Sequence, residues 1–189
     1  MITTVTYADY VVAARKQPAY FRGRWPLIAA TLAMIQPLLP DDPARVLELG
    51  PMHMPLVPGS DTMELASMAE HVGRQPTYTH DATVAPWPIE GDRYDLFIAL
   101  QVFEHLGPHD PGVGQRHAWA EVCRVARAAV ISLPYLWDCR DASNCHGGIT
   151  RETIASWTGR QPDDDIVLQT HQIDNAYRRR IICSYQGLR

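Results

Sequence analysis

The stretch ARVLELGPMHM, residues 44–54, decides the fold of this chain. Its segment 46–49 is apolar apart from one acid, Glu48, and Gly50 and Pro51 then end the run. A short buried strand with this ending is typical of the carboxyl edge of an open α/β sheet. Loops and strand-end side chains face a crevice at that edge, so ligands bind there. We therefore expect a ligand site directly after residue 49.

Size and composition favour one globular domain. The chain has 189 residues, of which 46% are hydrophobic and 20% charged, which suits a single sizeable core. A net charge of −4 without a basic block argues against nucleic acid as the main partner. The arginine run 178–180 leads into the apolar residues 181–183, and we interpret it as the solvated start of a strand.

The sequence contains no secretion signal that we recognise and no membrane span. Its start, MITTVTYADY, lacks a basic region followed by an apolar one, and no apolar run approaches about 18 residues. We expect a cytoplasmic protein. The four cysteines, at 123, 139, 145 and 183, form no CxxC pair, so Cys139, Cys145 and His146 lack the spacing of a metal site. We expect reduced thiols and no metal.

Helices and strands alternate along the chain, which predicts an open, mostly parallel α/β sheet with flanking helices. Helices are predicted over 5–17, from Pro26 to Pro37, around 119–126 and after Thr150. Strands are predicted at 44–49, 77–82, 94–100, 129–133, 166–168 and 180–185, the last two as an antiparallel pair at the sheet edge. We expect a single domain over residues 1–189, with residues 1–40 as a helical lid segment and residues 44–189 as the α/β core.

The first crossover helix should be shortened or missing. Between Gly50 and Ser60 the chain has three prolines and a further glycine, in a space where a crossover needs about ten to twelve residues. The following segment, 61–65, is interpreted as the end of a second strand at Asp61 or as the entry to a helix around 62–72.

Polar groups follow four of the predicted strands, at Glu48–Gly50, Asp61, His80–Asp81 and Gln101–His105. The carboxyl ends of parallel strands lie side by side, and carboxylates there can accept hydrogen bonds from ribose hydroxyls or an adenine amine. Such acids suit a cationic or hydroxyl-rich ligand better than one rich in phosphate. A dinucleotide would need GxGxxG and an acid about twenty residues later, which this chain lacks. An adenosine-type cofactor is the prediction.

In order, these motifs resemble those of the class I S-adenosylmethionine-dependent methyltransferases. The resemblance runs from Arg45 to Pro134 and rests on VLELGPMHM, GSDTMEL, YTHDATVAPWPI and YDLFIALQVFEHL. It implies a Rossmann-like methyltransferase sheet and S-adenosylmethionine as cofactor. The implied cofactor contacts are Glu48, Gly50, Pro51 and Met52 for the methionine part, Asp61 for the ribose, Asp81 with Ala82 beside it for the adenine amine, and Gln101 and Val102 for the methionine and methyl end. Thr62 and Met63, which follow Asp61, are also counted as cofactor contacts. The chain departs from the family pattern by having Met52 and Met54 where two loop glycines usually stand.

The resemblance implies methyl transfer to an oxygen or nitrogen of a small molecule. His105 is the candidate general base and Glu104 a weaker catalytic candidate, although both could serve only the structure. Candidate acceptor contacts are Tyr20, Arg24, Tyr135, Trp137 and His146. The alternative is a methyltransferase-like subunit without catalysis that binds a protein partner, and a homo-oligomer is also possible; a nicotinamide oxidoreductase fits least.

Overall fold

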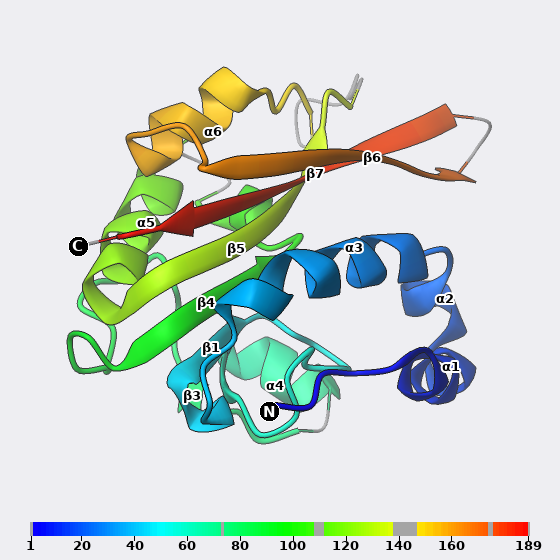
Figure 1. The fold of residues 1–189 in the computed structure, drawn as a ribbon, viewed down its shortest axis with the longest axis horizontal. Helices are drawn as coiled ribbons and strands as arrows, with labels where there is room; N and C mark the ends of the chain where they lie inside the picture. The colour runs from blue at the N-terminus through cyan, green and yellow to red at the C-terminus, as the bar shows by residue number, and fades with distance from the viewer. Residues whose placement is uncertain (1, 73, 108–111, 138–146, 174–175, 189) are drawn as a thin grey trace.

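The computed structural model describes residues 2–72, 74–107, 112–137, 147–173 and 176–188. Within them, seven strands form one sheet in the order β3-β2-β1-β4-β5-β7-β6 (Figure 1). β7 runs antiparallel to both of its neighbours, and the other pairs are parallel. The predicted fold class, an open and mostly parallel α/β sheet with an antiparallel pair at the C-terminal edge, is confirmed.

The strands are β1 (Val46–Leu49), β2 (Asp61–Glu64), β3 (Tyr78–Thr79), β4 (Tyr94–Leu100), β5 (Ala126–Tyr135), β6 (Asp164–Ile173) and β7 (Ala176–Gln186). The helices are α1 (Tyr7–Lys16), α2 (Pro18–Phe21), α3 (Trp25–Ile35), α4 (Ala66–Val72), α5 (Val113–Val125) and α6 (Arg151–Thr158). Short 3-10 turns are η1 (Gln36–Leu38), η2 (Pro43–Arg45) and η3 (Phe103–His105).

Both faces of the sheet are buried, which explains why its central strand is a continuous apolar run. In β4, Phe97 points to the face covered by α5 and α6, where it joins a core with Trp119 and Ile154. Ile98 points to the opposite face and packs with residues of α3. Figure 1 shows the two helical layers on either side of the sheet, with α1 and α2 beside the start of α3.

The link from β1 to β2, residues 50–60, contains no helix, as its prolines predicted. The buried carboxylate of Glu48 holds this link together. It accepts hydrogen bonds from the backbone N–H groups of Leu56 (2.7 Å) and Val57 (2.8 Å) and from the Ser60 hydroxyl (2.8 Å). Burial raises the pKa of Glu48, and the three donors oppose that rise. The Glu48 side chain thus stabilises a connection that has a crossover helix in other open α/β sheets.

The boundaries of β2 differ from the prediction. Asp61 begins the strand, opposite Leu47, and the strand continues through Met63, opposite Leu49, to Glu64. The expectation that Asp61 closes the second strand is therefore wrong. Met63 is fully buried between β1 and β3, and burying it requires the strand to extend past Asp61.

Among the described residues, no helix combines the length and the apolar character that crossing a membrane requires.

Replacing Glu48 should destabilise the fold strongly. Glu48→Ala leaves two buried N–H groups without an acceptor, which should lower the free energy of unfolding by about 3 kcal/mol or more. Ser60→Ala removes only the hydroxyl donor and should cost about 1 kcal/mol. Urea unfolding followed by circular dichroism measures both, and equal stabilities of the two variants would contradict this role of Glu48.

Candidate functional site

A cavity of about 690 Å³ opens at the carboxyl ends of β1, β2, β3 and β4. Its wall residues come from the α2–α3 turn and from the segments that follow these strands: Tyr20 and Arg24; Leu49, Gly50 and Met52; Met63, Glu64, Leu65 and Met68; His80, Asp81, Ala82 and Thr83; and Leu100, Gln101, Val102, His105, Leu106 and Gly107. A single cavity thus joins the strand ends that the sequence placed together. Its volume lies within the range of small-molecule sites.

Gly50 follows β1 and lies next to Met63 of β2 and to Val102, which comes after β4. Its backbone N–H donates to the carbonyl of Met63 (2.9 Å). It has a positive φ of 61°, and an added Cβ would lie only 2.8 Å from Cγ2 of Val102. Only glycine fits both constraints, because other residues rarely adopt this backbone conformation and would collide with Val102.

Met52 and Glu64 shape the loop that lacks the usual glycines. Met52 has a φ of 51°, which is uncommon for a residue with a side chain. Its N–H donates to Oε1 of Glu64 (2.8 Å), and this bond holds the loop against the end of β2. Burial raises the pKa of Glu64, while the Met52 N–H and the charge of Arg74 favour its ionised form.

Glu64, which the sequence analysis missed, is the acid at the carboxyl end of β2. Asp61 lies at the other end of the strand and is absent from the walls of this cavity. It accepts hydrogen bonds from the hydroxyls of Tyr94 (2.8 Å) and Thr77 (3.2 Å). Thr62 is buried next to it and also bonds with Thr77. The signal for Glu64 was in the sequence, since TMEL places an acid directly after an apolar strand residue.

Asp81 and Ala82, which follow β3, both line the cavity. Oδ1 of Asp81 accepts hydrogen bonds from the N–H (2.9 Å) and hydroxyl (2.8 Å) of Thr83, so a tight turn fixes the carboxylate. The carbonyl of Ala82 accepts a hydrogen bond from Nε1 of Trp87 (3.1 Å). This turn therefore presents an oriented acid to the cavity.

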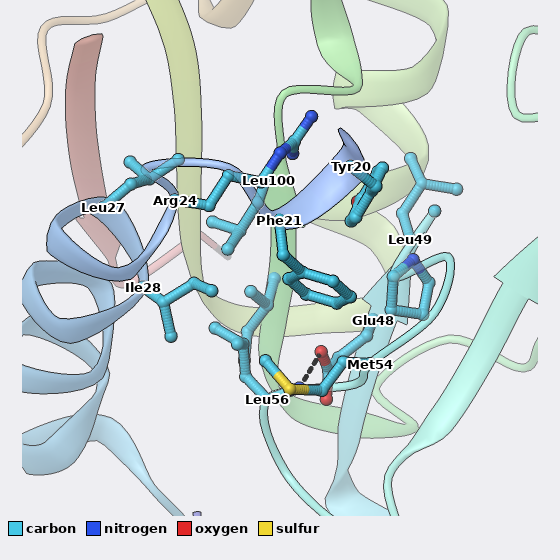
Figure 2. A pocket seen from close by; sticks show the side chains of 13 residues that line it. Tyr20, Phe21, Arg24, Leu27, Ile28, Glu48, Leu49, Met54, Leu56 and Leu100 are labelled. Carbon is cyan, nitrogen blue, oxygen red and sulfur yellow. Dashed lines mark hydrogen bonds between the residues drawn. The ribbon is translucent and has the colours of Figure 1, made fainter. Parts of the chain in front are cut away.

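Glu48 and Pro51 line a second, smaller cavity beneath α2. Figure 2 shows the Glu48 carboxylate turned toward Leu56 and Met54, with Phe21 above it. Because its hydrogen bonds go to residues 56, 57 and 60, Glu48 stabilises the loop, and it does not line the large cavity. Tyr20, Arg24 and Gly50 lie between the two cavities and contribute to both.

Gln101 follows β4, lines the cavity and is hydrogen-bonded to residues of β5 and β7. It has a φ of 57°, and its N–H donates to the carbonyl of Ser132 (2.9 Å). Its side chain donates through Nε2 to the Ser132 hydroxyl (3.3 Å) and accepts through Oε1 from Nε of Arg180 (3.0 Å). A non-glycine residue held in this conformation by neighbouring strands is typical of functional sites. Val102, which follows it, also lines the cavity.

Two ionisable groups follow Gln101. His105 lines the cavity with a half-exposed side chain, and burial lowers its pKa. Glu104 is buried, and within the described residues neither carboxylate oxygen has a hydrogen-bond partner; the nearest ion-pair atom is Nε2 of His105, at 4.0 Å. Burial raises the pKa of Glu104 to about 8, although the charges of Arg180 and Arg24 lower it. At neutral pH this carboxyl holds its proton while the imidazole can accept one.

The predicted acceptor residues fall into three groups. Tyr20 and Arg24 line the cavity, with the Arg24 guanidinium 4.0 Å from the centre of the Tyr20 ring. Tyr135 is buried beneath α6, and its hydroxyl accepts a hydrogen bond from Arg151 (2.8 Å), away from the cavity walls. Trp137 stacks with Arg178 at 4.5 Å beside the start of β7. His146 lies outside the described residues.

The described part of the chain contains no group of three or more His, Cys, Asp or Glu side chains that could hold a metal ion. Cys123 and Cys183 are free thiols. Cys139 and Cys145, like His146, lie outside the described residues.

Comparison with known proteins assigns the fold. No protein-family model and no curated protein sequence matches the chain. A methyltransferase from Methanosarcina mazei, described as S-adenosylmethionine-dependent, superposes with a TM-score of 0.60 at 12% identity, covering 82% of this chain and 96% of that one. The chain has the class I methyltransferase fold.

Two further structures share this methyltransferase fold. Magnesium protoporphyrin IX methyltransferase from Synechocystis, solved with bound S-adenosylmethionine, has a TM-score of 0.50 at 15% identity and covers 90% and 83% of the two chains. A protein described for conversion of a disulfide bond into a thioacetal group in echinomycin biosynthesis has a TM-score of 0.51 at 12% identity and covers 86% and 80%. At such identities the likeness concerns the fold alone.

Glu104 should make stability depend on pH. Its pKa is raised from 4.5 to about 8, so between these values the folded protein holds a proton that the unfolded chain releases. The free energy of unfolding should therefore fall as the pH rises through this range, by up to about 1.4 kcal/mol per pH unit. Glu104→Gln should make this slope shallower, because Glu48 and Glu64 also have raised pKa values and keep their own contributions, whereas the exposed Glu70→Gln should leave the slope unchanged. Urea unfolding at several pH values measures the slope, and an unchanged slope in Glu104→Gln would contradict the prediction.

Proposed function

We propose that this protein is an S-adenosylmethionine-dependent methyltransferase that acts on an oxygen or nitrogen of a small molecule. The observation that carries the proposal is the large cavity, with two fixed acids at one end and His105 at the other. The methyltransferase fold supports it, because ligands of open α/β sheets bind at this edge.

The residues at the acidic end fit an adenosine. Glu64 ends β2, beside the loop of Gly50 and Met52, where its carboxylate can accept hydrogen bonds from ribose hydroxyls. Asp81 and the backbone around Ala82 can bind the adenine edge. The absence of a Cβ at Gly50 lets a ligand approach the backbone closely.

The middle of the cavity fits the charged amino-acid part of the same cofactor. Arg24 supplies a cation that can bind a carboxylate, and the Tyr20 ring, which packs against the Arg24 guanidinium at 4.0 Å, helps to hold that cation in place. Tyr20 lies in α2 and Arg24 directly precedes α3, and both line the cavity. This arrangement supports a lid role for the N-terminal segment.

The main task of the protein in methyl transfer is to align the acceptor atom with the methyl group. When bound, S-adenosylmethionine supplies a methyl group that is already activated by the sulfonium. Gln101 and Val102 would set the position of the acceptor, since Ser132 and Arg180 hold Gln101 rigidly. An acceptor hydroxyl or amine would give up its proton to a ring nitrogen of His105 as the new bond to carbon forms.

A subunit without catalysis is the second candidate. It is favoured by Met52 and Met54, which stand where the family usually has glycines, and by the missing crossover helix. This alternative predicts no cofactor binding and a stable complex with another chain, so a cofactor titration separates the two proposals.

Calorimetric titration with S-adenosylhomocysteine tests the proposal. Wild type should bind saturably, and Glu64→Gln should bind about tenfold more weakly because it loses a charged acceptor for the ribose. Asp61→Asn, at the opposite end of β2, should retain affinity within about twofold. No heat with wild type would overturn the proposal, and a larger loss in Asp61→Asn than in Glu64→Gln would return the ribose role to Asp61.

A further inference from the structure

Glu64, the acid that we assign to the ribose, is held both through its backbone and through its side chain. Its backbone carbonyl accepts a hydrogen bond from the N–H of His80 (3.0 Å), so the chain after β3 fixes the end of β2. Its Oε1 accepts a hydrogen bond from the N–H of Met52 (2.8 Å), and Oε2 has no hydrogen-bond partner among the described residues. Because Glu64 lines the large cavity, Oε2 is the oxygen that remains for a ligand.

Arg74, in the link between α4 and β3, lies next to this carboxylate. Its Nη2 is 3.8 Å from Oε1 of Glu64, which is close enough for an ion pair and too far for a hydrogen bond. Nη2 is buried, and within the described residues it has no hydrogen-bond partner. Arg74 does not belong to the described walls of the cavity, so its charge reaches a ligand there through Glu64.

The charge of Arg74 also acts on the loop of residues 50–60. Burial raises the pKa values of Glu48 and Glu64, and Arg74 favours the ionised form of both. These two acids hold the loop, Glu48 through residues 56, 57 and 60 and Glu64 through Met52. Arg74 therefore supports the loop and the cavity acid at the same time.

The other ionisable side chains around Glu64 come from the elements that surround it. They are Tyr20 of α2, Arg24 before α3, His53 of the loop, His71 of α4, and His80 and Asp81 after β3. Burial raises the pKa of Tyr20, so its phenol stays neutral. Burial and neighbouring cations, Arg74 among them, lower the pKa of His53. Any test of Arg74 must therefore separate the titration of Glu64 from that of His53.

We propose that Arg74 is a positioning residue of the cofactor site: it keeps Glu64 ionised and holds Oε1 beside the loop, which leaves Oε2 to accept hydrogen bonds from the ribose hydroxyls. The proposal rests on the proposed function, because it takes Glu64 as the ribose ligand. It adds to the site an arginine that acts only through another side chain.

The first test needs no ligand. Carbon-13 NMR of the glutamate carboxyl groups follows the titration of Glu64 in the full chain, and Glu64→Gln identifies its signal. Arg74→Met should move the midpoint of this titration to higher pH, because a neighbouring positive charge is lost. Arg74→Lys keeps a charge without the planar fork and should move the midpoint less.

A matched control is available at the opposite end of β2. Arg93 lies 3.7 Å from Oδ2 of Asp61, an ion pair of similar length to that of Arg74 with Glu64. Arg93→Met should leave the midpoint of Glu64 where it is in wild type. Thermal unfolding establishes that each variant is folded, and Arg74→Gln takes the place of Arg74→Met if the latter is not.

The second test is calorimetric titration with S-adenosylhomocysteine at several pH values. Where Glu64 is partly protonated, Arg74→Met should bind about threefold more weakly than wild type, a modest loss because the arginine is partly exposed. The loss should shrink as the pH rises, since Glu64 is then ionised in both proteins. In the Glu64→Gln background, Arg74→Met should change the affinity by less than about twofold at every pH, which separates Glu64 from His53.

The outcomes distinguish the two proposals. The positioning role is overturned if Arg74→Met leaves the midpoint of Glu64 unchanged, weakens binding equally at every pH, or acts no differently from Arg93→Met; the methyltransferase proposal then stands. If wild type binds no S-adenosylhomocysteine, the proposed function fails, and the role of Arg74 in a cofactor site fails with it.

Discussion

The carboxylate of Glu48 is the constraint on which the site depends. It lies at the end of β1, is buried, and accepts three hydrogen bonds from the loop that replaces the first crossover helix. A parallel strand pair usually needs a helix to cover the return path. Here the Glu48 side chain holds the connecting loop, residues 50–60, while β2 pairs with β1. Gly50, Met52 and Glu64 lie together in the wall of the cavity. In this protein the acid near the end of β1, Glu48, therefore holds the backbone of the loop, and the last residue of β2, Glu64, lines the cavity.

A second polar centre lies across the cavity, at Gln101. Its backbone is in a left-handed conformation, and its side chain connects Ser132 of β5 with Arg180 of β7. Glu104, close by, is a buried acid without a hydrogen-bond partner in the described residues. Buried polar groups are normally paired, and an unpaired one has a cost that calls for a role.

Local patterns predicted much of this chain and failed at specific places. The apolar run of β4 and the start of α6 directly after Thr150 were predicted correctly, because burial and helix capping act over a few residues. The end of β2 was placed at Asp61 because an acid after a loop resembles a strand end. Pairing with β1 continues the strand to Met63, and pairing with β3 continues it to Glu64. Tyr135 was expected near the acceptor, but side chains alternate along a strand and this one points beneath α6, to Arg151.

By itself, the sequence determined the alternation of helices and strands, the absence of the first crossover helix and the presence of acids at the strand ends, because hydrophobic period, proline and glycine act through neighbouring residues. Only the tertiary structure decided which acid serves which purpose. Strand register turned Glu48 toward its loop, moved Asp61 to the far end of β2 and left Glu64 at the cavity. It also brought Arg180 to Gln101 across 79 positions of sequence. Such pairings are set by which strands lie side by side in the sheet, and no local pattern in the chain encodes that distance.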